Sequence, residues 1–289
     1  MKIMVYEARP DERADLEKQA ALHGVELSVT DAVPTLENAS LAAGCIGVSI
    51  LGQGCIDAAL LDAYHALGIR YLSTRTIGYD HIDLDHARSI GLRVCSASYA
   101  PNGVADFTVM MILMCLRHYK QALWRGQVND FSLTGLQGRE MKDLTIGIIG
   151  TGRIGAQVAR NLSGFGCRIL AYDLRRNPAV EPQVTYVDFD TLLAQSDVIT
   201  LHMPLLDSNR HIINRESIAK MRDGVVIVNC SRGELADIEA LIEGIETGKI
   251  GALGMDTVEG DEGIIHADHR VDILPNRNWF YLHQFRNVI

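Results

Sequence analysis

The 289-residue sequence lacks a Cys-x-x-Cys pair, a basic stripe and any apolar run long enough to cross a bilayer. Its six cysteines are scattered, which argues against a disulfide framework or a zinc site and favours reduced thiols in a cytoplasmic protein. The longest apolar run, Val109–Leu116, is far shorter than the roughly 20 residues of a transmembrane helix. Only a short apolar patch precedes Glu7, so we expect no secretory signal and no membrane partner.

Positive charge is also scarce. The 27 Lys and Arg residues against 36 Asp and Glu residues give a net charge of −9, which argues against a nucleic acid as partner. The 47% of hydrophobic residues is the share of a folded globular protein and excludes disorder as the main state. At about 150 residues per domain, two domains are expected.

Apolar segments alternate between strand and helix patterns in two stretches, which predicts parallel sheets covered on both faces. The first stretch has strands at 2–6, 25–29, 47–51, 71–73 and 92–96, with helices at 11–23, 58–66 and 83–89. A long apolar helix is predicted over Val104–Gln121, followed by an irregular link at 130–143. The second stretch has strands at 144–149, 167–172, 198–202, 225–229 and 251–255, helices at 156–162, 189–194, 215–220 and 237–247, and the start of a strand at 287–289.

The segment Gly150-Thr-Gly-Arg-Ile-Gly155 is a GxGxxG motif that follows an apolar strand and opens a helix. In this context Gly150 permits a tight turn, Gly152 lets the backbone approach a diphosphate, and Gly155 lets helix and strand pack closely. The free N–H groups at the helix start hold the phosphates. A glycine turn without a ligand is the alternative interpretation.

Asp173 ends the next predicted strand, 18 residues beyond Gly155. A carboxylate at this point accepts hydrogen bonds from the adenosine ribose and repels a 2′-phosphate, which favours NAD over NADP. Arg175 and Arg176 lie nearby and weaken this preference.

Reduction of a carbonyl by a nicotinamide cofactor requires a cation for the substrate and a tuned acid–base group. Arg232 follows a buried strand at its carboxyl end, where open α/β sheets bind ligands. Asp256 ends a strand on the same sheet edge, and Asp261 lies five residues further on in an acidic run. An ordinary loop arginine and a solvated acidic loop are the alternatives.

Seven segments, taken in order, carry a family resemblance. The sequence resembles the D-isomer-specific 2-hydroxyacid dehydrogenases, above all the D-lactate dehydrogenases, including the vancomycin-resistance type. The segments are TRTIGYDHID at 74–83, SYAPNGVAD at 98–106, GIIGTGRIG at 147–155, LHMPL at 201–205, VNCSRGEL at 228–235, GKIGALGMDTVEG at 248–260 and the terminal RNVI.

The resemblance implies an α/β fold of two Rossmann-like domains with parallel sheets. A substrate domain over 1–98 is flavodoxin-like, and an NAD-binding domain over 99–289 is inserted in it. It further implies that Arg232 binds the substrate carboxylate, with the backbone amides of Ile77 and Gly78 and with Tyr99 in the pocket. The implied NAD site adds to the three glycines the residues Arg153, Ile154, Asp173, Met203, Pro204, Asn209, Cys230, Ser231 and Asp256, with His202 beside the adenosine.

Two departures from the family pattern affect the expected activity. The acid that pairs with the family's catalytic histidine is usually Glu, whereas the sequence has Asp261 there, with Glu262 as the alternative. The family's histidine follows the strand that begins with Asn-Val-Ile, and the chain stops at Ile289. We therefore expect a truncated chain that lacks the C-terminal return of the substrate domain and leaves an apolar face of that domain uncovered. Such a chain would bind NAD but turn over slowly.

The sequence accordingly predicts an NAD-dependent D-2-hydroxyacid dehydrogenase that reduces a pyruvate-like 2-keto acid. A non-catalytic NAD-sensing protein on the same scaffold is the alternative, favoured by the missing histidine and disfavoured by Arg232 and Tyr99. Lactate, 2-hydroxyisocaproate and phenyllactate enzymes share these motifs, and pocket residues around Ile50–Gln53 and Tyr99 would separate them. The resemblance also implies a homodimer through the nucleotide domain. No metal is expected.

Overall fold

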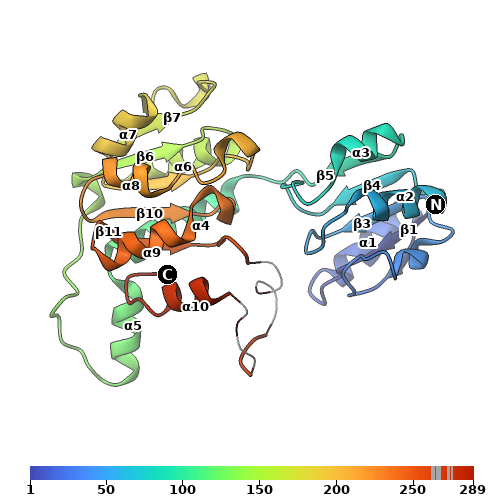
Figure 1. Cartoon of the computed structure of the whole chain (residues 1–289), viewed down its shortest axis with the longest axis horizontal. Coiled ribbons are helices and arrows are strands. Elements are labelled where there is room, and N and C mark those ends of the chain that lie inside the picture. Colours follow the sequence, from blue (N-terminus) through green and yellow to red (C-terminus); the bar gives the residue numbers. More distant parts are fainter. Residues whose placement is uncertain (262–263, 265–267, 272–273, 275) are drawn as a thin grey trace. The chain divides into compact units, whose positions relative to one another are not determined.

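The computed structural model describes residues 1–261, 264, 268–271, 274 and 276–289. The chain forms two compact units, Met1–Tyr99 and Ala100–Ile289, and each contains its own parallel sheet (Figure 1). The expected α/β class with two parallel sheets is therefore confirmed. Each unit is described by itself below.

The first unit has a five-stranded parallel sheet in the order β2-β1-β3-β4-β5. This is the flavodoxin-like order, and its topological switch point lies between β1 and β3. The strands are β1 (Lys2–Val5), β2 (Glu26–Val29), β3 (Gly47–Ile50), β4 (Tyr71–Thr74) and β5 (Arg93–Ser96). The helices are α1 (Arg13–His23), the 3₁₀ turn η1 (Ala39–Ala42), α2 (Ala58–Ala66) and α3 (Leu84–Ser89).

The core of the first unit lies mainly between its sheet, η1 and α2. Asp57 begins α2 by accepting a hydrogen bond of 2.9 Å from the Leu60 amide, and the helix then buries Leu61 and Tyr64. None of the 11 residues of α1 is fully buried. This helix therefore contributes less to the core than its apolar spacing suggests.

The second unit has a six-stranded parallel sheet in the order β11-β10-β9-β6-β7-β8. Numbered from β6, this is the Rossmann order, and its switch point lies between β6 and β9. The strands are β6 (Thr145–Ile149), β7 (Arg168–Tyr172), β8 (Thr185–Tyr186), β9 (Val198–Leu201), β10 (Val225–Asn229) and β11 (Ile250–Met255). The last residues extend the sheet as expected, because the Ile289 amide donates a hydrogen bond of 2.9 Å to the carbonyl of Leu253 in β11.

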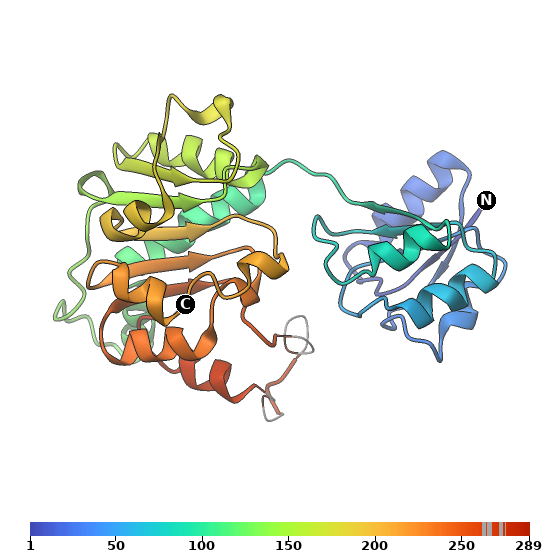
Figure 2. The ribbon, with the colours of Figure 1, turned by 45° about the horizontal axis from the view of Figure 1, so that its top comes forward.

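Two apolar cores cover the two faces of this sheet, so the sheet lies between helices (Figure 2). One core packs α7, α8 and α9 against the strands, and the other packs α4 and α6 against them. The helices and 3₁₀ turns are α4 (Asn102–Leu116), α5 (Tyr119–Gln127), η2 (Met141–Asp143), α6 (Arg153–Ser163), η3 (Pro178–Val180), α7 (Phe189–Gln195), η4 (Asp207–Asn209), α8 (Arg215–Lys220), η5 (Gly233–Leu235), α9 (Ile238–Glu246) and α10 (Arg277–His283). Within the described residues, no helix combines the length and the apolar content that spanning a membrane requires.

The prediction of one helix over Val104–Gln121 is wrong. The segment forms α4 and α5, which are separated at His118, whose φ of 50° is left-handed and cannot continue a helix. The side chain of His118 forms a hydrogen bond of 3.1 Å with the Gln137 carbonyl, which ties this break to the irregular link. The short strand β8 and the helix α10 were not predicted from the sequence.

Candidate active site

The GxGxxG motif forms the turn between β6 and α6. Gly150 has a φ of 94°, and a Cβ there would lie 2.7 Å from the carbonyl carbon of His202. A Cβ on Gly155 would lie 1.9 Å from the Gly150 carbonyl oxygen. Because side chains at either position would collide with backbone atoms, only glycine allows the strand, the turn and the helix to pack this closely.

Gly152 differs from these two glycines, because a Cβ on it would meet no atom within 4 Å. Gly152 caps the N-terminus of α6, where the first-turn amides and the positive end of the helix dipole favour an anion. Arg153 and Ile154 open the helix, and Ile154 packs against the core beside α6. Open space before a helix N-terminus fits the diphosphate of NAD.

Asp173 directly follows β7, and its carboxylate lies against the glycine turn. Oδ2 accepts hydrogen bonds from the Thr151 amide at 2.6 Å and from the Thr151 hydroxyl at 3.0 Å. Oδ1 accepts a hydrogen bond of 2.9 Å from the Arg175 amide. The negative charge is therefore fixed beside the turn, on the neighbouring strand, as binding of an adenosine ribose requires.

A polar network behind Asp173 was not found from the sequence. Thr151 is buried, and its hydroxyl accepts a hydrogen bond of 2.8 Å from the Tyr186 hydroxyl. The Thr151 carbonyl accepts one of 2.8 Å from the Asn177 side chain. The Tyr186 hydroxyl also accepts a hydrogen bond of 2.9 Å from the Asn177 amide. Tyr186 comes from β8, which the sequence analysis missed, so no local pattern linked it to the motif.

The loop after β9 carries His202, Met203, Pro204 and Asn209. Burial lowers the pKa of His202 to about 3, so its imidazole is neutral at physiological pH, with Nε2 3.0 Å from the Thr200 hydroxyl. The Asn209 side chain donates a hydrogen bond of 2.8 Å to the Pro204 carbonyl and accepts one of 2.8 Å from the Leu206 amide. Asn209 thus holds the shape of its own loop.

The loop after β10 carries Cys230, Ser231 and Arg232. The Asn229 side chain, which is fully buried, donates a hydrogen bond of 2.7 Å to the Arg232 carbonyl and accepts one of 3.0 Å from the Ser231 amide. The Asn229 carbonyl accepts a hydrogen bond of 3.0 Å from the amide of Asp256, at the end of β11. Asn229 therefore shapes the arginine loop, although the sequence analysis gave it no role.

Cys230 is not a nucleophile in this arrangement. Burial raises the pKa of its thiol to about 11, although a hydrogen bond with Thr108 acts in the opposite direction. The thiol is therefore protonated at physiological pH, and Cys230 packs as a small apolar side chain in the core beneath α4.

The loops of Arg232 and Asp261 touch one another. A Cβ on Gly233 would lie 2.1 Å from the carbonyl carbon of Val258, so the two loops meet through backbone atoms. The Asp261 carboxylate accepts a hydrogen bond of 3.0 Å from the Val258 amide. Glu262, the alternative acid, lies outside the described residues.

An acid–histidine pair beside this loop was also missed. The carboxylate of Glu259 lies 2.7 Å from Nε2 of His211 and 3.1 Å from the guanidinium of Arg210. This pair holds the base of the Asp261 loop against the loop that follows β9. From the sequence, only the acidic run of the Asp261 loop was noted, and not its histidine partner.

The predicted substrate residues Ile77, Gly78 and Tyr99 lie in the first unit. Ile77 and Gly78 are half-buried in the loop after β4, where the Thr76 hydroxyl donates a hydrogen bond of 2.8 Å to the Gly78 carbonyl. Tyr99 is 47% exposed at the end of the unit. The predicted cofactor residues and the two predicted catalytic residues all follow or flank the carboxyl ends of strands of the second sheet. In the described part of the chain, no group of three His, Cys, Asp or Glu side chains could hold a metal ion.

Comparison with known proteins matches these features to one family. The model of the NAD binding domain of D-isomer specific 2-hydroxyacid dehydrogenases matches residues 109–285, more than half of the chain. The chain belongs to this family. An aromatic 2-oxoacid reductase of Clostridium sporogenes is 41% identical over all of this chain and 88% of that protein.

Solved structures of the family have the same fold. The pyruvate reductase of Chlamydomonas reinhardtii superposes with a TM-score of 0.89 at 34% identity, over all of this chain and 88% of that one. The NAD-complexed D-isomer specific 2-hydroxyacid dehydrogenase of Lactobacillus delbrueckii ssp. bulgaricus superposes with a TM-score of 0.82 at 31% identity, with the same coverage. The predicted NAD-dependent D-2-hydroxyacid dehydrogenase activity is thereby confirmed, and the alternative of a non-catalytic NAD sensor has no support among these relatives.

Proposed function

We propose that this dehydrogenase reduces a short 2-keto acid such as pyruvate to the D-2-hydroxy acid. Residues 99–289 would bind NAD, and residues 1–98 would hold the substrate. The observation that carries the proposal is the contact between the Arg232 and Asp261 loops through Gly233, at the sheet edge that also carries the glycine turn. In this proposal a cation for the substrate and a carboxylate that orients a proton-donating imidazole lie next to the dinucleotide site.

Arg232 binds the substrate carboxylate in this proposal and polarises the neighbouring carbonyl oxygen. A guanidinium suits this task because its planar donors match a carboxylate in two parallel hydrogen bonds. The backbone amides of Ile77 and Gly78 bind the same carboxylate, and Tyr99 lines the pocket. Bound NADH supplies the hydride for the carbonyl carbon.

Asp261 takes the position of the carboxylate that pairs with the proton-donating histidine of the family. A carboxylate that accepts the second imidazole N–H fixes the tautomer and stabilises the imidazolium. Asp reaches less far than Glu, so its loop must lie closer to the imidazole. The hydrogen bond from the Val258 amide to Asp261 supports this role, because it fixes the turn that presents the carboxylate.

The remaining predicted residues line the dinucleotide. In this proposal Asp173 binds the adenosine ribose hydroxyls and disfavours a 2′-phosphate, so NADH is preferred to NADPH. The diphosphate lies at the glycine turn. The lining residues are Gly150, Gly152, Arg153, Ile154, Gly155, Asp173, Met203, Pro204, Asn209, Cys230, Ser231 and Asp256.

Oxidation of NADH by a panel of 2-keto acids tests the proposal. Pyruvate, 2-ketoisocaproate and phenylpyruvate are each assayed with NADH and with NADPH, and chiral chromatography identifies the product. We expect a D-hydroxy acid, the highest kcat/KM with pyruvate, and a preference for NADH. An L product, or equal rates with NADPH, would contradict the assignment of the site.

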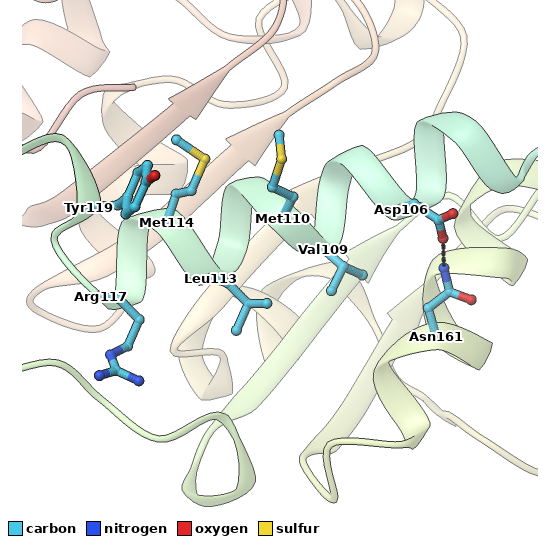
Figure 3. A pocket seen from close by; sticks show the side chains of 8 residues that line it. All are labelled: Asp106, Val109, Met110, Leu113, Met114, Arg117, Tyr119 and Asn161. Carbon is cyan, nitrogen blue, oxygen red and sulfur yellow. Dashed lines mark hydrogen bonds between the residues drawn. The ribbon is translucent and has the colours of Figure 1, made fainter. Parts of the chain in front are cut away.

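We also propose that the enzyme is a homodimer through the second unit. A groove of about 750 Å³ runs along α4 and is lined by the apolar side chains of Val109, Met110, Leu113 and Met114 (Figure 3). A hydrogen bond of 2.7 Å between Asp106 and Asn161 closes one end. The irregular link that follows α5 exposes Val128, Phe131 and Leu133 by 74%, 77% and 83%.

A second copy would cover these surfaces, because an apolar groove and large exposed apolar side chains are both typical of an interface. Light scattering should then give the mass of one chain for Met110→Asp and the mass of two chains for the wild type. A wild-type monomer at micromolar concentration would contradict the dimer.

A cytoplasmic location is proposed from the six cysteines, all of which are free thiols.

A further inference from the structure

Glu7, the second residue after β1, has an unusual backbone. Its φ is 54°, a left-handed conformation that residues with side chains seldom adopt, and the residue is only 3% exposed. A backbone outlier of this kind persists only where the surrounding contacts fix it, and such outliers concentrate at functional sites. The contacts of Glu7 therefore indicate what it does.

The Glu7 carboxylate accepts hydrogen bonds from three successive backbone amides. These belong to Leu51, to Gly52 at 2.9 Å and to Gln53 at 2.8 Å. Successive amides that converge on one point form a nest for an anion. Here the anion is a carboxylate of the chain itself, and it fixes the loop that follows β3.

The main chain of Glu7 holds a second loop through Arg75. The Glu7 carbonyl accepts a hydrogen bond of 3.0 Å from Nη2 of Arg75, which also bonds the Tyr6 carbonyl at 2.9 Å and the Glu12 carboxylate at 3.0 Å. Arg75 begins the loop of Ile77 and Gly78, and its amide bonds the Ile50 carbonyl at 2.8 Å. One residue thus fixes both loops.

These two loops also meet at their tips. Gly52 has a φ of 94°, and a Cβ on it would lie 3.0 Å from the His81 ring. The loops follow β3 and β4, which are neighbours in the sheet, and β1 and β3 enclose the switch point at which such sheets bind ligands (Figure 1). A shift of the Leu51–Gln53 loop would therefore change the surface next to Ile77 and Gly78.

We propose that Glu7 is a positioning residue that fixes the Leu51–Gln53 loop and thereby sets which 2-keto acid side chains the enzyme accepts. The inference rests on the proposed function, in which Ile77 and Gly78 bind the substrate carboxylate. Glu7 acts through the backbone of the loop and not on the substrate. Its removal should therefore change the binding of the keto acid and leave the binding of NADH unchanged.

Glu7→Gly is the sharpest variant, because glycine accepts the φ of 54° without strain and leaves the three amides without their anion. We expect the KM for pyruvate to rise about tenfold and that for phenylpyruvate to rise less, with kcat changed by less than about threefold, as for lost ground-state binding. The KM for NADH should stay within about twofold. Sodium formate is a small carboxylate that fits the amide nest. It should lower the KM of Glu7→Gly for pyruvate most of the way to the wild-type value, whereas sodium chloride should not.

Two controls separate this role from a structural one. Asn129→Gly relieves a positive φ of 59° on an exposed residue of the second unit, and its kinetics should equal those of the wild type. Formate should not lower the KM for pyruvate of the wild type. Glu7→Gln keeps the side-chain length and one acceptor oxygen but places an NH₂ donor against at least one amide donor. The KM for pyruvate should therefore rise more than twofold but less than in Glu7→Gly, without rescue by formate, and this test holds even if the glycine variant folds poorly.

The outcomes distinguish the inference from the proposed function. A wild-type enzyme that reduces no 2-keto acid with NADH contradicts the proposed function and the inference together. In another outcome, the wild type is active while Glu7→Gln or Glu7→Gly has a KM for pyruvate and a substrate preference within twofold of the wild-type values. This result would overturn the inference alone. Equal losses of keto acid and NADH binding would also overturn it, because they would show a general loss of structure.

Discussion

The hydroxyl of Ser231 donates a hydrogen bond of 2.6 Å to the carbonyl oxygen of Met203. This bond joins the loops that follow β9 and β10, two neighbouring strands whose ends flank the proposed dinucleotide site. The two loops are adjacent in space although 28 residues separate the bonded pair in the sequence. Their relative position therefore depends on this contact and on the strand pairing beneath it.

Ser231→Ala should weaken NADH binding, because the Met203 loop loses its link to the β10 loop. A single hydrogen bond contributes about 1 kcal/mol, so the Kd for NADH should rise about fivefold. Quenching of protein fluorescence by NADH measures the effect. Ser163→Ala is the matched control, since Ser163 bonds a carbonyl within its own helix, 2.7 Å away. A Kd unchanged in Ser231→Ala would contradict the role of this link.

Arg232→Lys should reduce kcat/KM for pyruvate strongly, because an ammonium cannot form two parallel hydrogen bonds with a carboxylate. A loss of about 100-fold is expected from the 2–5 kcal/mol that a buried charged contact contributes. The Kd for NADH should stay near that of the wild type. Steady-state kinetics and NADH titration measure the two effects. Arg168→Lys, a change on an exposed arginine that bonds Gln195, is the control.

Asp173→Ser should allow NADPH, since it removes the charge that repels a 2′-phosphate while the loop after β7 stays in place. The ratio of kcat/KM for NADPH to that for NADH should rise by about 10- to 100-fold, or about 1.4–2.7 kcal/mol. Kinetics with both cofactors at saturating pyruvate measure this ratio. A ratio that does not change would show that Asp173 does not select the cofactor.

Asp197 should make stability depend on pH. Burial by itself raises the pKa of its carboxyl, but hydrogen bonds from the Thr145 amide and from Arg139 and Arg222 outweigh burial and lower the pKa below its usual value. Because the folded pKa lies below the unfolded one, the carboxylate stabilises the fold above a pH of about 4 and loses this effect as pH falls through the folded pKa.

Asp197→Asn should therefore reduce the free energy of unfolding by about 2 kcal/mol at neutral pH, since two guanidiniums lose their anion. The difference between variant and wild type should shrink as the pH falls below about 4 and through the folded pKa, because the wild-type carboxyl becomes protonated. Urea unfolding at several pH values measures it. Asp190→Asn, at an exposed partner of Lys220, should change stability by less than about 0.5 kcal/mol at any pH.

Local patterns in the sequence predicted most of the fold. The bounds of α2, α8 and β10 agree with those expected, because Asp57 and Asn214 cap the two helices and β10 is a continuous apolar run. The break at His118 was not predictable, since neither glycine nor proline stands between the apolar run Val109–Leu116 and α5. Strand β8 has only two residues and carries too little pattern to find.

The places of the candidate site residues in the fold were predictable where a motif follows a strand. Gly150, Asp173 and Arg232 each follow a strand and are recognised by sequence distance alone. Glu7 was missed because its carboxylate bonds backbone amides of another segment. Asn229 was missed because its side chain bonds backbone atoms only two and three residues further on, which no residue pattern indicates. The Glu7 carboxylate bonds residues more than 40 positions away, and only the paired strands β1 and β3 bring them together.

The carboxylate of Asp173 is immobilised by the chain's own Thr151 and Arg175. The conformational entropy of that side chain has therefore been lost during folding and is not lost again when a dinucleotide arrives. Calorimetry of Tyr186→Phe, which removes one support of Thr151, should then show a less favourable binding entropy with a nearly unchanged enthalpy.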